Sequence, residues 1–157
     1  MKKLRVYLET TMFNYYFDTE RDGHANTIRL FEAIGSGEYE GYTSRYVTYE
    51  LQMTQEPKKS AMLALIEKYN IHVLEIDKES DDLSSEYVRE GIIPEKYRLD
   101  SAHIASATVN HLDCVLSFNF QHINKIKTKE MTAIVNLREG YQGIIICTPM
   151  EVLDDKE

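Results

Sequence analysis

The chain has 157 residues, with 18 basic and 26 acidic side chains, a net charge of −8 and a hydrophobic content of 43%. This length suits a single domain over residues 1–157, and the composition excludes disordered, collagen-like and disulfide-built proteins. The acidic excess also excludes nucleic-acid binding through general charge alone, because such binding needs a basic surplus.

The apolar pattern alternates between short and long periods along the chain. Short runs rich in branched and aromatic residues predict five β-strands, at Leu4–Leu8, Tyr39–Thr43, Ile71–Ile76, Cys114–Phe118 and Ile144–Cys147. Stretches with helical spacing predict helices at Ala25–Ile34, Arg45–Met53, Pro57–Tyr69, Leu83–Glu90, Glu95–Leu112 and Thr128–Tyr141. Because strands and helices alternate, we expect an α/β domain with a mostly parallel sheet covered by helices on both faces.

The cysteines and the start of the chain indicate a compartment. Cys114 and Cys147 lie inside separate apolar runs, which is typical of buried strand cysteines rather than of a redox or zinc pair. Free cysteines fit a reducing cytoplasm. Arg5 and Glu9 interrupt the apolar stretch that a signal peptide needs, and no later run is long enough to cross a bilayer. We expect a cytoplasmic protein that is not bound to a membrane.

Polar side chains follow two of the predicted strands. Glu9 and Thr10 follow the first strand, and Ser117 and Asn119 lie at the end of the fourth. Ligands of parallel α/β sheets bind beyond the carboxyl ends of the strands, so these side chains are candidates for a functional site. A purely capping role for Glu9 is disfavoured, because Glu is a poor helix cap and Thr10 or Thr11 could cap better.

Two further acids lie in predicted helices. Asp100 is surrounded by small and apolar residues, and a buried aspartate is costly unless it is paired, hydrogen-bonded or metal-bound. His103 follows one turn later on the same side, where a core or rim histidine is the more usual interpretation. Glu50 borders the apolar side of its helix and by itself is typical of a solvated surface glutamate.

In their order and spacing these segments resemble the PIN domain family, which includes the VapC-type toxins of toxin–antitoxin systems. The most specific part is an Asp-x-x-His-Ile-Ala-x-Ala helix that begins at Asp100, followed by Ser-x-Asn-x-x-His from Ser117 to His122. The likeness covers nearly the whole chain. It implies a three-layer α/β/α domain with a central, mostly parallel sheet of about five strands, and an acidic pocket that holds Mg²⁺ or Mn²⁺ for endoribonuclease chemistry.

The resemblance also assigns roles by position. The residues that would bind the metal and act in catalysis are Glu9, Glu50, Asp100 and Asn119. Thr10 and Ser117 would support them as neighbouring hydroxyl groups. Such a set suits phosphodiester hydrolysis, because carboxylates bind hard cations, which lower the pKa of bound water and neutralise charge on the phosphate. Three convergent carboxylates without a cation would have to take up protons.

Two positions depart from the family pattern, in which aspartate is usual. Glu9 extends its carboxylate one methylene further, and Asn119 provides an oxygen without a charge, which weakens metal binding. The departures keep a second interpretation open, a catalytically weakened PIN-like domain that serves as an RNA- or protein-binding module. A third, an unrelated nucleotide-binding domain, lacks the Gly-rich phosphate loop that it would need.

The residues around this set could contribute to RNA binding. His122 could contact a phosphate or replace the missing acid at the pocket rim. Lys125, Lys127 and Lys129 could meet an RNA backbone, although a solvated surface is at least as good an interpretation.

Aromatic residues and partners complete the expectation. Tyrosines near the proposed site in sequence could stack on bases, although packing is their commoner role: Tyr15, Tyr16, Tyr46 and Tyr49. By resemblance, we expect a ribonuclease toxin of a type II toxin–antitoxin system that acts on RNA, binds a cognate antitoxin protein and forms a homodimer.

Overall fold

The computed structural model describes residues 2–154. Its strands are β1 (Leu4–Leu8), β2 (Tyr39–Ser44), β3 (His72–Leu74), β4 (Cys114–Leu116) and β5 (Ile145–Cys147). They form one five-stranded sheet in the order β3-β2-β1-β4-β5, and every neighbouring pair is parallel. The predicted five-stranded parallel sheet is therefore confirmed. Parallel strands need crossover connections, and in this sheet helices provide them.

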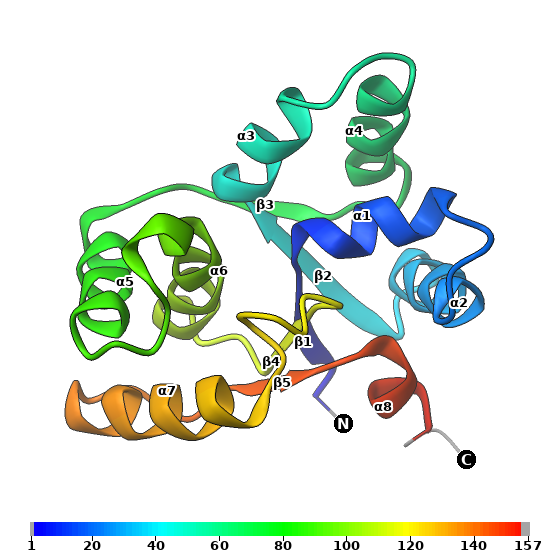
Figure 1. Cartoon of the computed structure of the whole chain (residues 1–157). Coiled ribbons are helices and arrows are strands. Elements are labelled where there is room, and N and C mark those ends of the chain that lie inside the picture. The colour runs from blue at the N-terminus through cyan, green and yellow to red at the C-terminus, as the bar shows by residue number, and fades with distance from the viewer. Residues whose placement is uncertain (1, 155–157) are drawn as a thin grey trace.

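The helices cover the sheet on both sides. They are α1 (Thr10–Phe17), α2 (His24–Gly35), α3 (Arg45–Gln52), α4 (Lys58–Lys68), α5 (Lys78–Arg89), α6 (Arg98–Val109), α7 (Ile126–Arg138) and α8 (Pro149–Asp154), with a 3₁₀ turn, η1 (Glu95–Tyr97), before α6. Figure 1 shows α5 and α6 on one side of the sheet and α1 and α2 on the other. None of the helices described here is long and apolar enough to span a membrane.

Two helices, α1 and α8, lie outside the segments that the sequence predicts. Helix α1 is only 8 residues long and is rich in β-branched and aromatic residues, which have low helix propensity. Burial of Met12 and Phe13 against the core stabilises it instead. Helix α5 also begins earlier than predicted, because Asp77 caps it by accepting a hydrogen bond from the Ser80 backbone nitrogen at 2.8 Å.

The core lies along β1 and α6. Strand β1 is central, so Val6, Tyr7 and Leu8 are buried although successive side chains point to opposite faces. Helix α6 is buried from Ser101 to Val109, as its small residues predict. The two cysteines are buried and free. Because α6 packs beside β1, Asp100 in the first turn of α6 lies close to the end of β1.

Candidate functional site

The chain topology brings the predicted residues to one edge of the sheet. Glu9 directly follows β1, and Asn119 lies shortly after β4, the parallel neighbour of β1. Glu50 lies on α3, which begins directly after β2. Asp100 is in the first turn of α6, which precedes β4. The carboxyl ends of adjacent parallel strands open at the same edge, so four distant parts of the sequence contribute to one site.

Glu9 is held by hydroxyl groups at the start of α1. Only 3% of this residue is exposed. Its Oε1 accepts hydrogen bonds from the Thr11 backbone nitrogen at 3.2 Å, from Thr11 Oγ1 at 2.6 Å and from Ser117 Oγ at 2.6 Å. Burial raises the pKa of Glu9, against the opposing effects of the His103 charge and these hydrogen bonds.

The structure makes Glu9 the N-cap of α1, so the expectation that disfavours a capping role for this residue is wrong. Glutamate is normally a poor cap because its longer side chain loses more freedom when it is fixed. Here the hydroxyls of Thr11 and Ser117 fix the carboxylate and offset that disadvantage.

His103 lies at the centre of a buried hydrogen-bond chain. Its Nε2 is 2.8 Å from Glu50 Oε1, and its Nδ1 is 2.7 Å from the Tyr7 hydroxyl. The Tyr7 hydroxyl is in turn 2.6 Å from Ser44 Oγ, and Thr10 Oγ1 donates to Glu50 Oε1 at 2.5 Å. Glu50 is therefore anchored from two elements, α6 and the start of α1.

His103 is also surrounded by negative charge. Burial by itself lowers the pKa of His103. The hydrogen bond to Glu50 and the charges of Glu50, Glu9 and Asp100 raise this pKa by more than burial lowers it, so the net shift is upward. Burial likewise raises the pKa of Glu50, but His103 and the Thr10 hydroxyl outweigh burial and lower it overall. The pair thus favours an imidazolium beside a carboxylate.

Asp100 is less well compensated than Glu50. Burial is the main reason that the pKa of Asp100 is raised, and the negative charge of Glu50 adds to it. The charges of His103 and His122 and a hydrogen bond with the Asn119 side chain act in the opposite direction without cancelling the shift. Asp100 is therefore a half-buried acid whose charge the protein balances only in part.

The loop after β4 forms the remaining wall. The Asn119 backbone nitrogen donates to Ser117 Oγ at 2.9 Å, and Asn119 Oδ1 accepts from the His122 backbone nitrogen at 3.0 Å. The His122 ring stacks on Tyr97 with centroids 4.1 Å apart, and its Nε2 is buried without a hydrogen-bond partner among the described residues. His122 thus brings an unused ring nitrogen to the side of the site occupied by Asp100.

The donor atoms suit a hard divalent cation, but their arrangement supplies few direct ligands. Between residues 2 and 154, no three His, Cys, Asp or Glu side chains are grouped so as to hold a metal ion. Glu9 Oε1 carries three hydrogen bonds, and Glu50 Oε1 carries two. Mg²⁺ commonly uses only one or two carboxylates, with water and substrate phosphate as its other ligands. The site fits that mode rather than an all-protein cage.

The predicted lysine cluster does not form one face. Lys125 precedes α7, whereas Lys127 and Lys129 lie within it two positions apart, and side chains at that spacing diverge around a helix. The Lys127 amine donates to the backbone oxygen of Gly91 at 3.1 Å, at the turn after α5. A role of these lysines in RNA binding stays a prediction.

Sequence analysis missed the inner part of the network. Tyr7 and Ser44 were not identified as site residues, and His103 was given a core or rim role rather than a central one. The position of Tyr7 in the sequence was a signal for this network. A tyrosine in the middle of a central strand is buried, and its hydroxyl must find a hydrogen-bond partner.

No protein-family model and no curated protein sequence matches this chain. Among solved structures, the fold resembles Mycobacterium tuberculosis VapC20, described as a sarcin-ricin loop cleaving toxin. The TM-score is 0.55 at 14% sequence identity, over 74% of this chain and 92% of that chain. It also resembles VapBC2 from Rickettsia felis bound to a DNA fragment from their promoter, with TM-score 0.55, 12% identity, and coverage of 92% and 98%. The chain therefore has the PIN-domain, VapC-like fold that the sequence resemblance predicts.

Proposed function

We propose that this protein is an endoribonuclease that hydrolyses RNA with the aid of Mg²⁺ or Mn²⁺, as the toxin of a toxin–antitoxin pair. The observation that carries the proposal is the meeting of Glu9, Glu50 and Asp100 around the buried His103 at the carboxyl edge of the sheet. The description of VapC20 as a sarcin-ricin loop cleaving toxin supports RNA as the substrate class.

Each carboxylate has a different part in the proposal. Glu50 and Asp100, which are half-buried and repel each other as anions, would hold the cation. Glu9 remains a predicted ligand through Oε2, since Oε1 carries its three hydrogen bonds. A bound divalent ion at this place supplies a water of lowered pKa and compensates charge that develops on the phosphate.

The other residues would keep the acids in position. His103 and Thr10 hold Glu50 ionised and fixed, and the Asn119 amide orients Asp100. His122 stays a predicted phosphate contact beside Asp100, and because its unpartnered Nε2 is buried, the ring would have to turn to meet a phosphate oxygen.

RNA cleavage by matched aspartate variants tests the proposal. Asp100→Asn removes the uncompensated charge with little change in shape, and we expect cleavage in Mg²⁺ or Mn²⁺ to fall by about 100-fold or more. Asp82→Asn is the control, because Asp82 pairs with Lys78 on the exposed surface of α5. Equal cleavage by wild type and Asp100→Asn would contradict the proposal, as would full activity in EDTA.

The second candidate function is a PIN-like module that binds RNA or protein without efficient catalysis. The uncharged Asn119 and the lack of three grouped metal ligands in the described residues favour it. It predicts RNA binding that is the same in wild type and Asp100→Asn, without cleavage by either.

Partners remain part of the proposal. The net charge of −8 suits a basic antitoxin, and the Rickettsia structure contains VapBC2 bound to promoter DNA. We also propose the homodimer that the resemblance implies, and light scattering would distinguish it from an 18.3 kDa monomer.

A further inference from the structure

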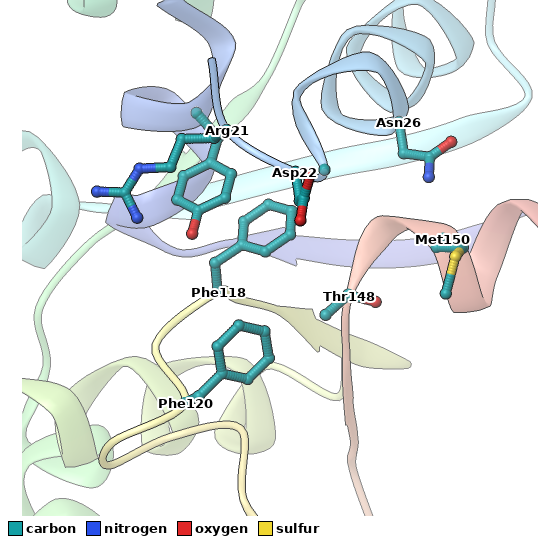
Figure 2. A pocket seen from close by; sticks show the side chains of 9 residues that line it. Arg21, Asp22, Asn26, Phe118, Phe120, Thr148 and Met150 are labelled. Atoms are coloured by element: carbon teal, nitrogen blue, oxygen red, sulfur yellow. The ribbon is translucent and has the colours of Figure 1, made fainter. Parts of the chain in front are cut away.

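We call Glu9, Glu50 and Asp100, with their partners Ser117 and Asn119, the acidic centre. A cavity of about 430 Å³ opens at the same edge of the sheet. Figure 2 shows Phe118 and Phe120 on one side of this cavity, Thr148 and Met150 on the other, and Asp22 and Asn26 above. These residues come from the loop after β4, from the segment after β5 and from the start of α2. We call this space the aromatic cavity.

The segment after β4 separates the two sites. Ser117 and Asn119 belong to the acidic centre, whereas Phe118 and Phe120 line the aromatic cavity. The Phe118 backbone nitrogen donates at 2.8 Å to Thr11 Oγ1, a hydroxyl that also donates to the buried acid at the end of β1. A ligand that occupies the acidic centre therefore needs to extend only across this short segment to reach the cavity.

The inner part of the aromatic wall, Phe118, is held by packing contacts. Phe118 stacks on Tyr15 with ring centroids 3.9 Å apart and planes within 4°. Gly23, at φ +94°, fits against the Phe118 edge, where a Cβ would lie 2.8 Å from Cε1. Phe120 meets Phe118 edge to face at 6.4 Å. Because these contacts hold Phe118, a ligand that stacks there has to order only the exposed Phe120 ring.

The cavity leaves apolar surface open to solvent. Phe120 is 56% exposed and Met150 is 52% exposed, on opposite sides of the space. A planar ring between them would stack on the aromatic side chain and contact the thioether with its other face or edge. The shape and the apolar faces thus favour a flat ligand.

The polar groups decide which flat ligand fits. The carboxylate of Asp22 repels a phosphate but accepts hydrogen bonds from an amino group, and the Asn26 amide adds a donor and an acceptor. The Arg21 guanidinium also lines the cavity, 5.3 Å from the Tyr15 ring centroid. Its Nε donates to Asp18 Oδ2 at 2.9 Å, and its terminal nitrogens can meet a phosphate. Apolar faces, a hydrogen-bonding edge and a cation in the lining match a nucleotide.

We propose that the aromatic cavity binds a base of the RNA strand whose scissile phosphate lies at the acidic centre, with amino-bearing bases preferred over uracil. This inference rests on the proposed ribonuclease function for its ligand and adds a base-reading subsite to it. A tyrosine or tryptophan side chain of a partner protein could fill the same faces, but it would offer only one donor to the Asp22 carboxylate and no phosphate to Arg21.

A single tryptophan tests the contact directly. The chain contains no tryptophan, so Phe120→Trp places the only indole on the exposed wall of the cavity. We expect short oligoadenylate or oligocytidylate, added in EDTA so that the strand stays intact, to quench this fluorescence more strongly than oligouridylate. The matched control is Leu137→Trp on α7, a side chain that is 79% exposed and is not part of the cavity lining. It also corrects for absorbance by the RNA.

Two further variants measure the energetics of the same contact. Phe120→Ala is expected to weaken binding of oligoadenylate by roughly 5- to 100-fold in fluorescence anisotropy, while Leu137→Ala leaves binding unchanged. Asp22→Asn is expected to reduce the preference for amino-bearing bases without abolishing binding, because an amide accepts and donates equally.

The outcomes separate this inference from the proposed function. Quenching that equals the Leu137→Trp control, or unchanged RNA binding by Phe120→Ala, overturns the base subsite even where Asp100-dependent cleavage is found. Specific quenching without any cleavage by the wild type supports the subsite and rejects the ribonuclease. Quenching by a basic peptide but not by RNA would overturn the subsite and assign the cavity to a protein partner.

Discussion

Glu50 and Asp100 are two half-buried acids close to His103, and they differ in how the protein compensates their charge. Glu50 shares one oxygen with His103 and Thr10, and its pKa is lowered despite burial. Asp100 has no comparable partner, and burial together with the Glu50 charge raises its pKa. The charge of Glu50 is therefore compensated by His103 within the protein, whereas the charge of Asp100 requires a bound cation or a proton.

Removal of the internal cation is expected to have the largest effect on stability. His103→Leu would leave the Tyr7 hydroxyl and Glu50 without their central partner, and loss of one member of a buried pair costs about 3–5 kcal/mol. We expect the free energy of unfolding in urea to fall by about 3 kcal/mol, because Glu50 is partly exposed. His72→Leu on the exposed edge strand is the control and should change stability by less than about 0.5 kcal/mol.

Amide variants of the two acids should shift stability in opposite directions. Glu50→Gln removes the charge that stabilises His103, so we expect a lower midpoint of urea unfolding in EDTA. Asp100→Asn removes a charge that burial disfavours, so we expect a slightly higher midpoint, which corresponds to a gain of less than about 1 kcal/mol in the free energy of unfolding after solvent screening. Shifts of the same sign in both variants would break the contrast between the two acids.

The pH dependence of stability is a finer test of the same pair. The pKa of Glu50 is lowered, so its contribution is present above the ordinary value of 4.5 and is lost as pH falls through the folded pKa. The pKa of His103 is raised, so its contribution is fully present below 6.5 and is lost as pH rises through the folded pKa. Burial raises the pKa of Asp100 and of Glu9, so the ionisation of these two acids also lowers the stability of the protein as pH rises.

The pair therefore predicts a maximum of stability between pH 4.5 and pH 6.5, measured as the free energy of unfolding in urea across that window. In His103→Leu the alkaline decline should become shallower. A wild-type profile that rises steadily through neutral pH would contradict the assigned protonation of His103.

The strand pattern made most of the fold predictable, because each strand carries its own local signal. Leu4–Leu8 is an apolar run whose last three residues are buried in the central strand, and α6 is marked by its small residues. Helix α1 could not be predicted in the same way, because its aromatic side chains are stabilised by distant packing rather than by helix propensity.

Within the site, the types of residue were predictable and the partners were not. The acids could be found from their places at the ends of strands and in a small-residue helix. The capping role of Glu9 depends on Ser117, which is 108 positions away, and the central role of His103 depends on Tyr7, which is 96 positions away. Such contacts arise only when the parallel sheet brings the strand ends together.

Calorimetric titration with Mn²⁺ tests most directly whether the uncompensated half of the acidic centre takes a cation. We expect micromolar binding by the wild type and by the surface control Asp82→Asn, and at least about tenfold weaker binding by Asp100→Asn. No detectable heat up to millimolar Mn²⁺ in the wild type, or equal affinity in Asp100→Asn, would contradict the account.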